Sequence, residues 1–404
     1  MFAFHFVLSR KLGLAHYGAL YTIISIATFI AVLGGILTIV IARLIAEHRR
    51  EPDRLSLLCG SSVKQSSYLG IAMCALMLAL SVPIAQFLRV PDIAVVMFLA
   101  VFAGSQLALA GLRGVLQGLQ EFPRLATSLI VEAFVRTGLA IIMAAFGFGI
   151  AAAVGAYALG TIFAIGYAVV AVRRSTSLRF GEVGMAPARV VRLSFGAALS
   201  TLAIAGLGIV DVLLVRHYFS NAASSIYGAV SLAGKMVYFS VGFLPTIVLP
   251  KATAGALSGD RPARVLFPAS LIILCMSFVS LAVFLLVPGP LVAAIVGHQY
   301  DSAVPYVFRY AVAMTFLGAS NAFVAYRLGV NDFSFIPAAL LFVVAEAIAI
   351  AFLHRTLDEV ITIVIVVNAA VLLAVLYGMG KRNALSAGPL QTDPMLIAEE
   401  IQAH

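Results

Sequence analysis

The residues of this sequence that could do chemistry are charged side chains set inside long apolar stretches. Glu132 and Arg136 lie within TSLIVEAFVRTGLAII, residues 127–142. Their spacing of four places both on one face of a helix, where they can pair. An arginine at the centre of a membrane helix costs about 2.5 to 3.5 kcal/mol. We therefore expect either a self-neutralised pair that fixes this helix to a neighbour, or a pair facing water. In the second case Arg136 binds a phosphate of the substrate, and Glu132 either modulates the charge of Arg136 or carries a coupling proton.

Four further charged residues interrupt apolar segments of the second half. Lys235 lies ten residues into the segment 225–249, with no carboxylate three or four positions away. We expect Lys235 to attract an anionic lipid head group or to pair with Asp211, itself an interface residue in the alternative interpretation. Glu346 stands alone in LLFVVAEAIAIAF and is a candidate proton carrier or one side of an inter-helix pair. Arg309, near a segment end where it reaches water, is the third basic candidate for substrate binding.

The composition indicates the class of protein that holds these charges. Of 404 residues, 62% are hydrophobic and only 11% are charged, and the mean hydropathy is +1.08. Such a chain is a polytopic membrane protein, because a soluble domain needs more surface charge. A spanning helix needs about 20 apolar residues. Eleven predicted spans lie at 18–42, 66–88, 93–112, 125–147, 149–172, 193–215, 225–249, 265–287, 304–326, 333–353 and 359–379.

A twelfth helix is implied by MFAFHFVLS at the start of the sequence. Nine residues do not cross about 30 Å of hydrocarbon. The stretch also lacks the charged region and cleavage site of a signal peptide. We interpret it as the second half of a first helix that starts upstream. The expected fold is therefore all-α, with about twelve transmembrane helices, the first one clipped.

Lys and Arg residues predict the orientation of these helices. The even-numbered loops and the tail hold 18 of them, and the odd-numbered loops hold 5. Because cytoplasmic loops are enriched in Lys and Arg, both termini are expected in the cytoplasm. The loops are too short for an extramembrane domain.

Short strings recur in the second half at a nearly constant separation. They are separated by 210, 208 and 211 residues: YGA at 17–19 and 227–229, TIVIAR at 38–43 and TIVLPK at 246–251, GLQEF at 118–122 and GVNDF at 329–333. Six helices per half is an even number, so both halves insert the same way up around a central cavity. The expected divisions are a six-helix bundle at 1–172, a cytoplasmic linker at 173–192, a second bundle at 193–380 and a cytoplasmic tail at 381–404.

Other residue types carry less chemistry. The cysteines Cys59, Cys74 and Cys275 show no metal-binding or disulfide spacing, and no metal or cofactor is expected. The Phe and Tyr residues scatter along the spans and are interpreted mainly as core or lipid-facing. The glycines of GLRGVLQG, residues 111–118, permit close helix approach or a hinge.

Several of these strings carry a resemblance to a known family. RKLGLAHYGALY at 10–21, GVLQGLQEF at 114–122, DVLLVRHYFSNAASSIYGAVSLAGK at 211–235 and VGHQYDSA at 296–303 resemble the bacterial oligosaccharide flippases, which include the O-antigen flippases. These polysaccharide-biosynthesis exporters are related to the multidrug and toxic-compound extrusion transporters and to the lipid II flippases. The resemblance covers about residues 8–380. Lipid II flippases carry two further C-terminal helices that this sequence lacks.

The resemblance implies a fold and a function. The fold is two six-helix bundles around a central cavity in the bacterial inner membrane. The function is to flip undecaprenyl-pyrophosphate-linked oligosaccharides to the outer leaflet for O-antigen, capsule or exopolysaccharide assembly. Coupling to H⁺ or Na⁺, contact with membrane lipids, and work beside a polymerase and glycosyltransferases are expected, without nucleic acid.

Three alternatives remain open from the sequence. A multidrug or metabolite exporter of the same fold predicts interior carboxylates that outweigh cations. A membrane-embedded glycosyl transferase, polymerase or ligase needs catalytic groups in sizeable outer loops, yet the longest such loop, 288–303, holds no Lys or Arg and only one carboxylate, Asp301. No phosphate-binding loop, HExxH or GxSxG motif is present, so an enzyme is not expected. A non-transporting scaffold is the third alternative.

Overall fold

The computed structural model describes residues 2–90, 92–179, 188–258 and 263–385, and every regular element in these ranges is a helix. In chain order the helices are α1 (Phe2–Glu47), α2 (Pro52–Ala79), α3 (Ser81–Phe87), α4 (Ile93–Gly118), α5 (Phe122–Ala145), α6 (Ile150–Ser175), α7 (Ala188–Leu207), α8 (Val210–Tyr218), α9 (Asn221–Ser240), α10 (Leu244–Ser258), α11 (Ala263–Leu286), α12 (Pro288–Ile295), the 3₁₀ helix η1 (His298–Ala303), α13 (Val304–Gly329), α14 (Ile336–Phe352) and α15 (Leu357–Leu385).

The helices are long and apolar enough to make this a multi-pass membrane protein. Within the described ranges nine segments meet the length and hydropathy of a membrane span, and ten if the bent pair α2–α3 counts as one. The axis of α3 turns from that of α2 by 60°. The helix α14 is apolar but shorter, with 17 residues. The all-α, polytopic fold predicted from the composition is confirmed.

Each predicted span coincides with one helix or with two consecutive ones. The span 193–215 is divided between α7 and α8, and 225–249 between α9 and α10. The span predicted at 66–88 begins too late, because α2 already begins at Pro52. Proline in the first turn, followed by the acidic Asp53, is typical of a helix start.

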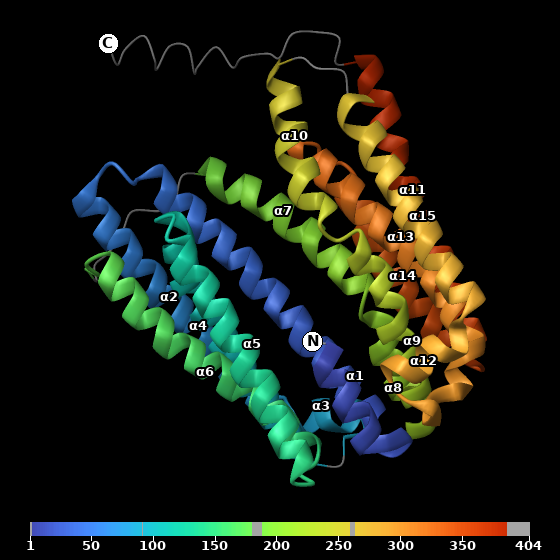
Figure 1. Ribbon diagram of the computed structural model, residues 1–404. Helices are drawn as coiled ribbons and strands as arrows, with labels where there is room; N and C mark the ends of the chain where they lie inside the picture. The colour runs from blue at the N-terminus through green and yellow to red at the C-terminus, as the bar shows by residue number, and fades with distance from the viewer. Residues whose placement is uncertain (1, 91, 180–187, 259–262, 386–404) are drawn as a thin grey trace.

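The helices form two groups in space (Figure 1). The N-terminal group holds α1–α6, with α4 packed on α1, α2 and α6. The C-terminal group holds α8–α15, with α13 packed on α9, α10 and α15, while α7 contacts both α1 and α14. The two groups approach each other at the end that holds α3, α8 and α12, and they separate toward the end that holds α10 (Figure 1). We call these the converging end and the diverging end.

The helix α1 reverses its direction at Gly13. This residue has φ 61° and ψ −172°, a left-handed conformation that glycine adopts without steric cost. The Nδ1 atom of His5 lies 3.2 Å from the hydroxyl of Tyr17. In a straight helix these residues would be about 18 Å apart along the axis. The predicted short first helix is therefore a segment of its own, residues 2–12, and it lies beside the segment that follows.

The repeated YGA strings lie where the two groups touch. A Cβ atom at Gly18 would come within 2.7 Å of the backbone nitrogen of Ser225, and one at Gly228 within 3.2 Å of Tyr21. The hydroxyl of Tyr21 donates a hydrogen bond to Ser231 Oγ at 3.0 Å. The missing side chains of the two glycines thus allow α1 and α9 to pack closely.

The glycine run of α4 also serves close packing. A Cβ atom at Gly111 would come within 2.6 Å of Ser66 on α2, and one at Gly114 within 2.7 Å of Ile41 on α1. The predicted close approach of helices is confirmed. Because α4 continues to Gly118, Arg113 lies inside this helix and not in a loop after residue 112, where the sequence placed it.

Parts of the predicted divisions lie outside the described residues. The predicted linker 173–192 includes 180–187, and the predicted tail 381–404 includes 386–404. The boundaries of the two bundles remain predictions.

Candidate functional site

Glu132 is buried on α5, and side chains of the neighbouring helices bind its carboxylate. Arg113 on α4 forms an ion pair with it at 2.8 Å, from Nη2 to Oε2. Gln106 on α4 and Thr161 on α6 both donate hydrogen bonds to Oε1. Only 8% of the Glu132 side chain is exposed. The main partner of Glu132 is therefore Arg113, which the sequence analysis did not consider.

Arg136 keeps part of its hydrogen-bonding capacity. Its Nη1 atom lies 3.9 Å from Glu132 Oε1, close to the limit for an ion pair. The guanidinium carbon lies 4.6 Å from the ring centre of Tyr157, a cation–π contact that leaves its edge donors uncovered. The side chain of Arg136 is 21% exposed. Of the two predicted alternatives, self-neutralisation by Glu132 is thus weak, because Arg113 already binds that carboxylate.

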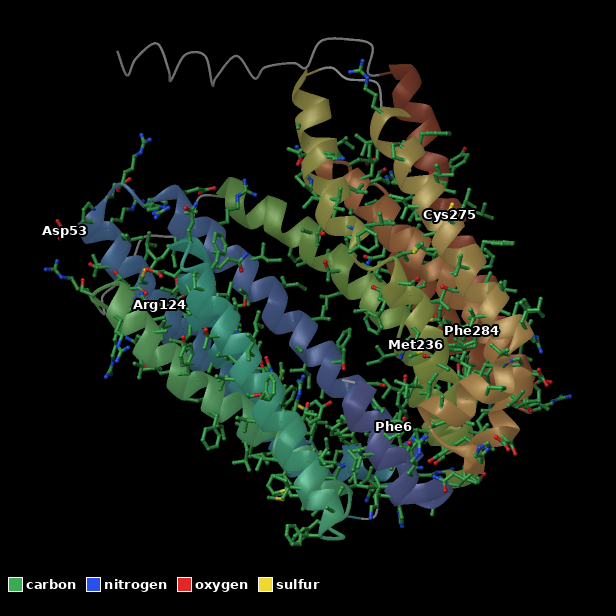
Figure 2. The ribbon with its side chains drawn as sticks, in the orientation of Figure 1. Phe6, Asp53, Arg124, Met236, Cys275 and Phe284 are labelled. Carbon is green, nitrogen blue, oxygen red and sulfur yellow. The ribbon has the colours of Figure 1, made fainter. Side chains whose placement is uncertain are left out.

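Lys235 lies at one end of a chain of polar contacts. Its Nζ atom is 5.4 Å from the ring centre of Tyr21, whose hydroxyl donates to Ser231. Ser231 Oγ is 3.1 Å from the hydroxyl of Tyr310, which donates to Asp211 Oδ2 at 2.7 Å. Met236, the residue after Lys235, lies near the middle between the converging and diverging ends (Figure 2). Lys235 is half-buried, and within the described part of the chain no carboxylate oxygen lies within 4.0 Å of it.

Asp211 lies in the first turn of α8 and is fully buried, with 0% exposure. Tyr227 and Tyr310 each donate a hydrogen bond to Oδ2 at 2.7 Å, and the backbone N–H of Val212 donates to Oδ1 at 2.8 Å. The alternative interpretation of Asp211 as an interface residue stays a prediction, although α8 packs on α1, α9 and α14 and the side chain does not reach the protein surface. The predicted pair with Lys235 is not formed, since tyrosine hydroxyls bind the carboxylate instead.

Glu346 lies on α14, which packs against α8, the helix that carries Asp211. It is fully buried, and neither of its carboxylate oxygens has a hydrogen-bond partner among the described residues. Asn368 on α15 is also fully buried, and its amide oxygen and nitrogen have no hydrogen-bond partner among the described residues. Unsatisfied buried polar groups are rare and need an explanation. Among the described residues, neither Asp211 nor Glu346 forms an ion pair with a basic side chain.

Arg309 lies apart from the other basic candidates. It pairs with Asp358 on α15 and donates from Nη2 to Thr362 Oγ1 at 2.6 Å. Its side chain is exposed near the converging end of α13. Arg309 therefore connects α13 to α15, and the structure does not bring it near Arg136 or Lys235.

The candidate charges predicted from the sequence differ in exposure. Arg136 and Lys235 remain partly exposed, whereas the carboxylates of Glu132, Asp211 and Glu346 are buried. The described residues contain no group of three His, Cys, Asp or Glu side chains suited to a metal ion. The three cysteines are unpaired. The arrangement suits binding of an anion by fixed cations and storage of a proton or cation by enclosed acids.

Sequence reasoning missed two kinds of residue in this site. Arg113 was assigned to a loop, although its place within the glycine run of α4 is a signal for a packed helix. Tyr227 and Tyr310 were grouped with core aromatics, and only their contacts with Asp211 reveal a polar role. No spacing in the sequence indicates those contacts, because the residues come from three different helices.

Comparison with known proteins adds a family. The model of a family described as polysaccharide biosynthesis protein matches residues 1–255. No curated protein sequence matches the chain.

Several solved structures share the fold. The inward-facing conformation of a multidrug resistance MATE family transporter of the MOP superfamily is similar with a TM-score of 0.76 at 15% identity, over 96% of this chain and 95% of that chain. The lipid II flippase MurJ in its inward closed conformation gives 0.67 at 13% identity, over 94% and 84%. A MOP superfamily transporter from Pyrococcus furiosus gives 0.52 at 17%, over 93% and 88%.

These solved proteins are described as transporters and a flippase. At such identities the likeness shows a common fold, which agrees with the two helix groups described above. The family match covers well over half of the sequence. The chain therefore belongs to the polysaccharide biosynthesis protein family, as a multi-pass membrane protein with a MATE-like fold.

Proposed function

We propose that this protein flips undecaprenyl-pyrophosphate-linked oligosaccharides from the cytoplasmic to the outer leaflet by alternating access. The observation that carries the proposal is the sign of the accessible interior charges: Arg136 and Lys235 are cations, while the interior carboxylates are buried. Glycosyltransferases supply such a cargo on the cytoplasmic face. A polymerase consumes it on the outer face, in O-antigen, capsule or exopolysaccharide assembly.

The chemistry of the cargo fits these two cations. A pyrophosphate that leaves water needs fixed donors to replace its hydration. The planar guanidinium of Arg136 can bind phosphate oxygens in pairs, and the ammonium of Lys235 adds a point charge. Outward movement of an anion is also favoured in a cell that is negative inside, by about 2.3 kcal/mol per charge per 100 mV.

The proposed orientation places the diverging end in the cytoplasm of the cell, with the protein in the bacterial inner membrane and both termini cytoplasmic. The Lys and Arg residues of the even-numbered loops support it, because they gather at this end. In this orientation the site between the two groups is approached from the leaflet where the cargo is made.

We assign the coupling step to the enclosed acids Asp211 and Glu346. Asp211 receives three hydrogen bonds that stabilise a carboxylate, whereas Glu346 receives none from the residues that the structure describes. Two adjacent charges of the same sign in an enclosed site are unfavourable. Glu346 is therefore the group that takes up and releases the coupling proton, and Na⁺ is the alternative ligand. Coupling resets the carrier, because the membrane potential already favours export of the anion.

Reconstituted protein tests the proposal directly. In proteoliposomes with a fluorescent polyprenyl-pyrophosphate oligosaccharide, Arg136→Gln and Lys235→Gln should each lower the flipping rate at least tenfold. Arg355→Gln, an arginine in the exposed turn between α14 and α15, is the matched control and should flip at the wild-type rate. Wild-type rates in both interior variants would refute the assignment of the site, and absence of flipping by the wild-type protein would refute the function.

The same preparation separates the proposal from drug export. In a proton-coupled exporter of organic cations, addition of a cationic dye would change the internal pH of the vesicles. The pyrophosphate-linked cargo would not be moved. We expect transport of the pyrophosphate-linked cargo and not of the dye, because Arg136 and Lys235 repel a cationic dye.

A further inference from the structure

Two short helices at the converging end stop in the same way. The helix α3 ends before Arg89, with φ 49°, and α12 ends before Gly297, with φ 104°. Both residues are left-handed, a common conformation just after a helix. They are 208 positions apart, which is the separation of one of the repeated strings. The two helix ends are thus equivalent positions of the N-terminal and C-terminal groups.

An arginine of the C-terminal group caps the end of α3. Arg216 on α8 donates from Nε to the carbonyl of Leu88 and from Nη2 to the carbonyl of Arg89, both at 2.7 Å. A further bond, from Nη1 to Asn221 Oδ1 at 2.9 Å, holds the guanidinium in place. Arg216 is only 2% exposed. The last carbonyls of a helix lack partners within it, so this arginine satisfies groups that would otherwise be unpaired.

An arginine of the N-terminal group caps the end of α12 in return. Arg10 on α1 donates from Nη2 to the carbonyl of Ala293 at 2.9 Å and from Nη1 to that of Ile295 at 3.4 Å. The neighbouring Ser9 donates to the carbonyl of Val296 at 3.0 Å. Each group therefore supplies one arginine to the short helix of the other.

We propose that Arg10 and Arg216, the arginine caps, form a reciprocal gate that holds the converging end closed. Arg10 Nη1 also donates to the carbonyl of Phe6 in its own helix at 2.9 Å, whereas the bonds to the carbonyls of α3 and α12 join one group to the other. Separation of the groups at this end breaks both sets at once and leaves the carbonyls of α3 and α12 without partners. Bonds to a guanidinium are charge-assisted and strong, yet water can replace them after opening. A gate of this kind is closed firmly and still reversible.

The two caps differ in exposure. Arg216 is buried, whereas Arg10 lines an open depression of about 390 Å³ together with Gly297 and His298. Water competes for the carbonyls beside Arg10 but not for those beside Arg216. Arg216 therefore contributes more to closure than Arg10 does.

The arginine caps affect the conformation of the converging end and do not bind the cargo. They rest on the proposed function only in that a transporter must open this end. A distance measurement without cargo tests them separately, so a failure of flipping and a failure of the gate are distinguishable.

Double electron–electron resonance gives the required distance. Spin labels are attached at Phe146→Cys and Phe352→Cys, two exposed positions at the converging end of α5 and α14, after replacement of the three native cysteines. The labelled protein with both arginine caps intact should show mainly the short distance between the two spin labels. Arg216→Ala should raise the ratio of open to closed molecules about tenfold, Arg10→Ala by less, and the double variant by more than either.

A conservative change keeps the test decisive if an alanine variant fails to fold. Arg216→Lys retains the charge but its compact ammonium does not span both carbonyls, so an intermediate shift is expected. Arg355→Ala, at the same end but outside the caps, should leave the distances unchanged. A second readout is Ser225→Cys, buried between the groups, which should react with an impermeant thiol reagent faster in Arg216→Ala. Unchanged distances in the folded double variant would overturn the gate.

Discussion

At the residue scale, Arg113 determines how much of Arg136 is available to an anion. Arg113 binds the Glu132 carboxylate at 2.8 Å, while Arg136 remains at 3.9 Å. In Arg113→Gln the carboxylate loses this partner, and Arg136 is the nearest replacement. We expect flipping to fall about tenfold although Arg113 need not touch the cargo, because a charged hydrogen bond is worth about 1.5 to 3 kcal/mol.

A double substitution checks this interpretation. Removal of the charge of Glu132 in Arg113→Gln/Glu132→Gln leaves Arg136 unpaired again, so the flipping rate in proteoliposomes should recover at least in part. A double variant as slow as Arg113→Gln alone would mean that Arg113 binds the cargo itself or is needed for folding.

Glu346 supports a second prediction at this scale. Glu346→Gln removes the titratable group but keeps its shape, so the flipping rate should lose its dependence on an imposed pH gradient while cargo still binds. The rate is measured in proteoliposomes at several internal and external pH values. Glu47→Gln, an exposed acid paired with Arg43 on α1, is the control and should behave as wild type. A Glu346→Gln protein with the wild-type pH response would exclude Glu346 as the proton carrier.

The sequence identified most charged residues of the candidate site but not their partners. Glu132, Arg136, Lys235 and Glu346 were evident because charge inside an apolar segment is costly and rare. Partners such as Arg113 come from other helices, and a periodic pattern within one helix carries no information about its neighbours.

At the element scale, Gly18 sets the distance between α1 and α9. Gly18→Ala would place a Cβ atom 2.7 Å from the backbone of Ser225, so one helix must shift. We expect a loss of about 1 to 3 kcal/mol, as for other overpacked sites. It should appear as a lower Tm in detergent. Gly35→Ala in the same helix meets no atom within 4 Å and should be neutral or slightly stabilising. Equal Tm values for the two variants would contradict close packing at Gly18.

The repeated strings GLQEF and GVNDF support different interactions at the same position of each repeat. In GVNDF, Asp332 binds the buried Arg327 at 2.6 Å, whereas in GLQEF the half-exposed Glu121 binds Arg124 at 3.1 Å. Burial raises the pKa of Asp332, but hydrogen bonds from the Ser334 N–H, from Arg327 and from the Ser334 hydroxyl outweigh it. The net effect is a pKa below the usual value of 3.8.

The sign of the pH dependence follows from this lowered pKa. The native state binds fewer protons at Asp332 than the unfolded state, so the ion pair stabilises the protein above pH 3.8 and loses this effect as the pH falls through the native pKa. Asp332→Asn should cost about 3 to 5 kcal/mol at pH 7 and converge with wild type in acid. Glu121→Gln should cost less than about 1 kcal/mol. Thermal unfolding of both proteins in detergent between pH 3 and 8 tests this prediction. A difference in stability between wild type and Asp332→Asn that does not change with pH would exclude this role of Asp332.

The helices themselves were largely predictable, and their breaks were not. Long apolar runs are a strong signal, so every predicted span has a helix. The reversal at Gly13 and the 60° turn into α3 depend on contacts such as that of His5 with Tyr17. These contacts are formed between segments, and the local sequence does not specify them.

At the scale of the whole molecule, the orientation in the membrane is the most direct prediction. His298, which begins η1 after the converging-end helix α12, has an 87% exposed side chain. The side chain of Asp53 is 91% exposed, and the residue lies at the diverging end (Figure 2). In intact cells carrying a variant without native cysteines, His298→Cys should react with an impermeant maleimide. Asp53→Cys should react only after permeabilisation. The reverse pattern would place the diverging end outside and refute the proposed direction of access.

The contact of α1 with α9 has a consequence for the origin of the fold. Tyr21 bonds Ser231, its own counterpart 210 positions later, and the counterparts Gly18 and Gly228 each face the helix of the other group, at Ser225 and Tyr21. Residues that meet their equivalents across an axis are the signature of an isologous interface, the kind found in symmetric homodimers. One ancestral six-helix polypeptide could therefore have formed this interface with a second copy of itself. Duplication and fusion of such a polypeptide would leave the two copies free to differ, as the Arg113–Glu132 pair of one group and the enclosed acids of the other do.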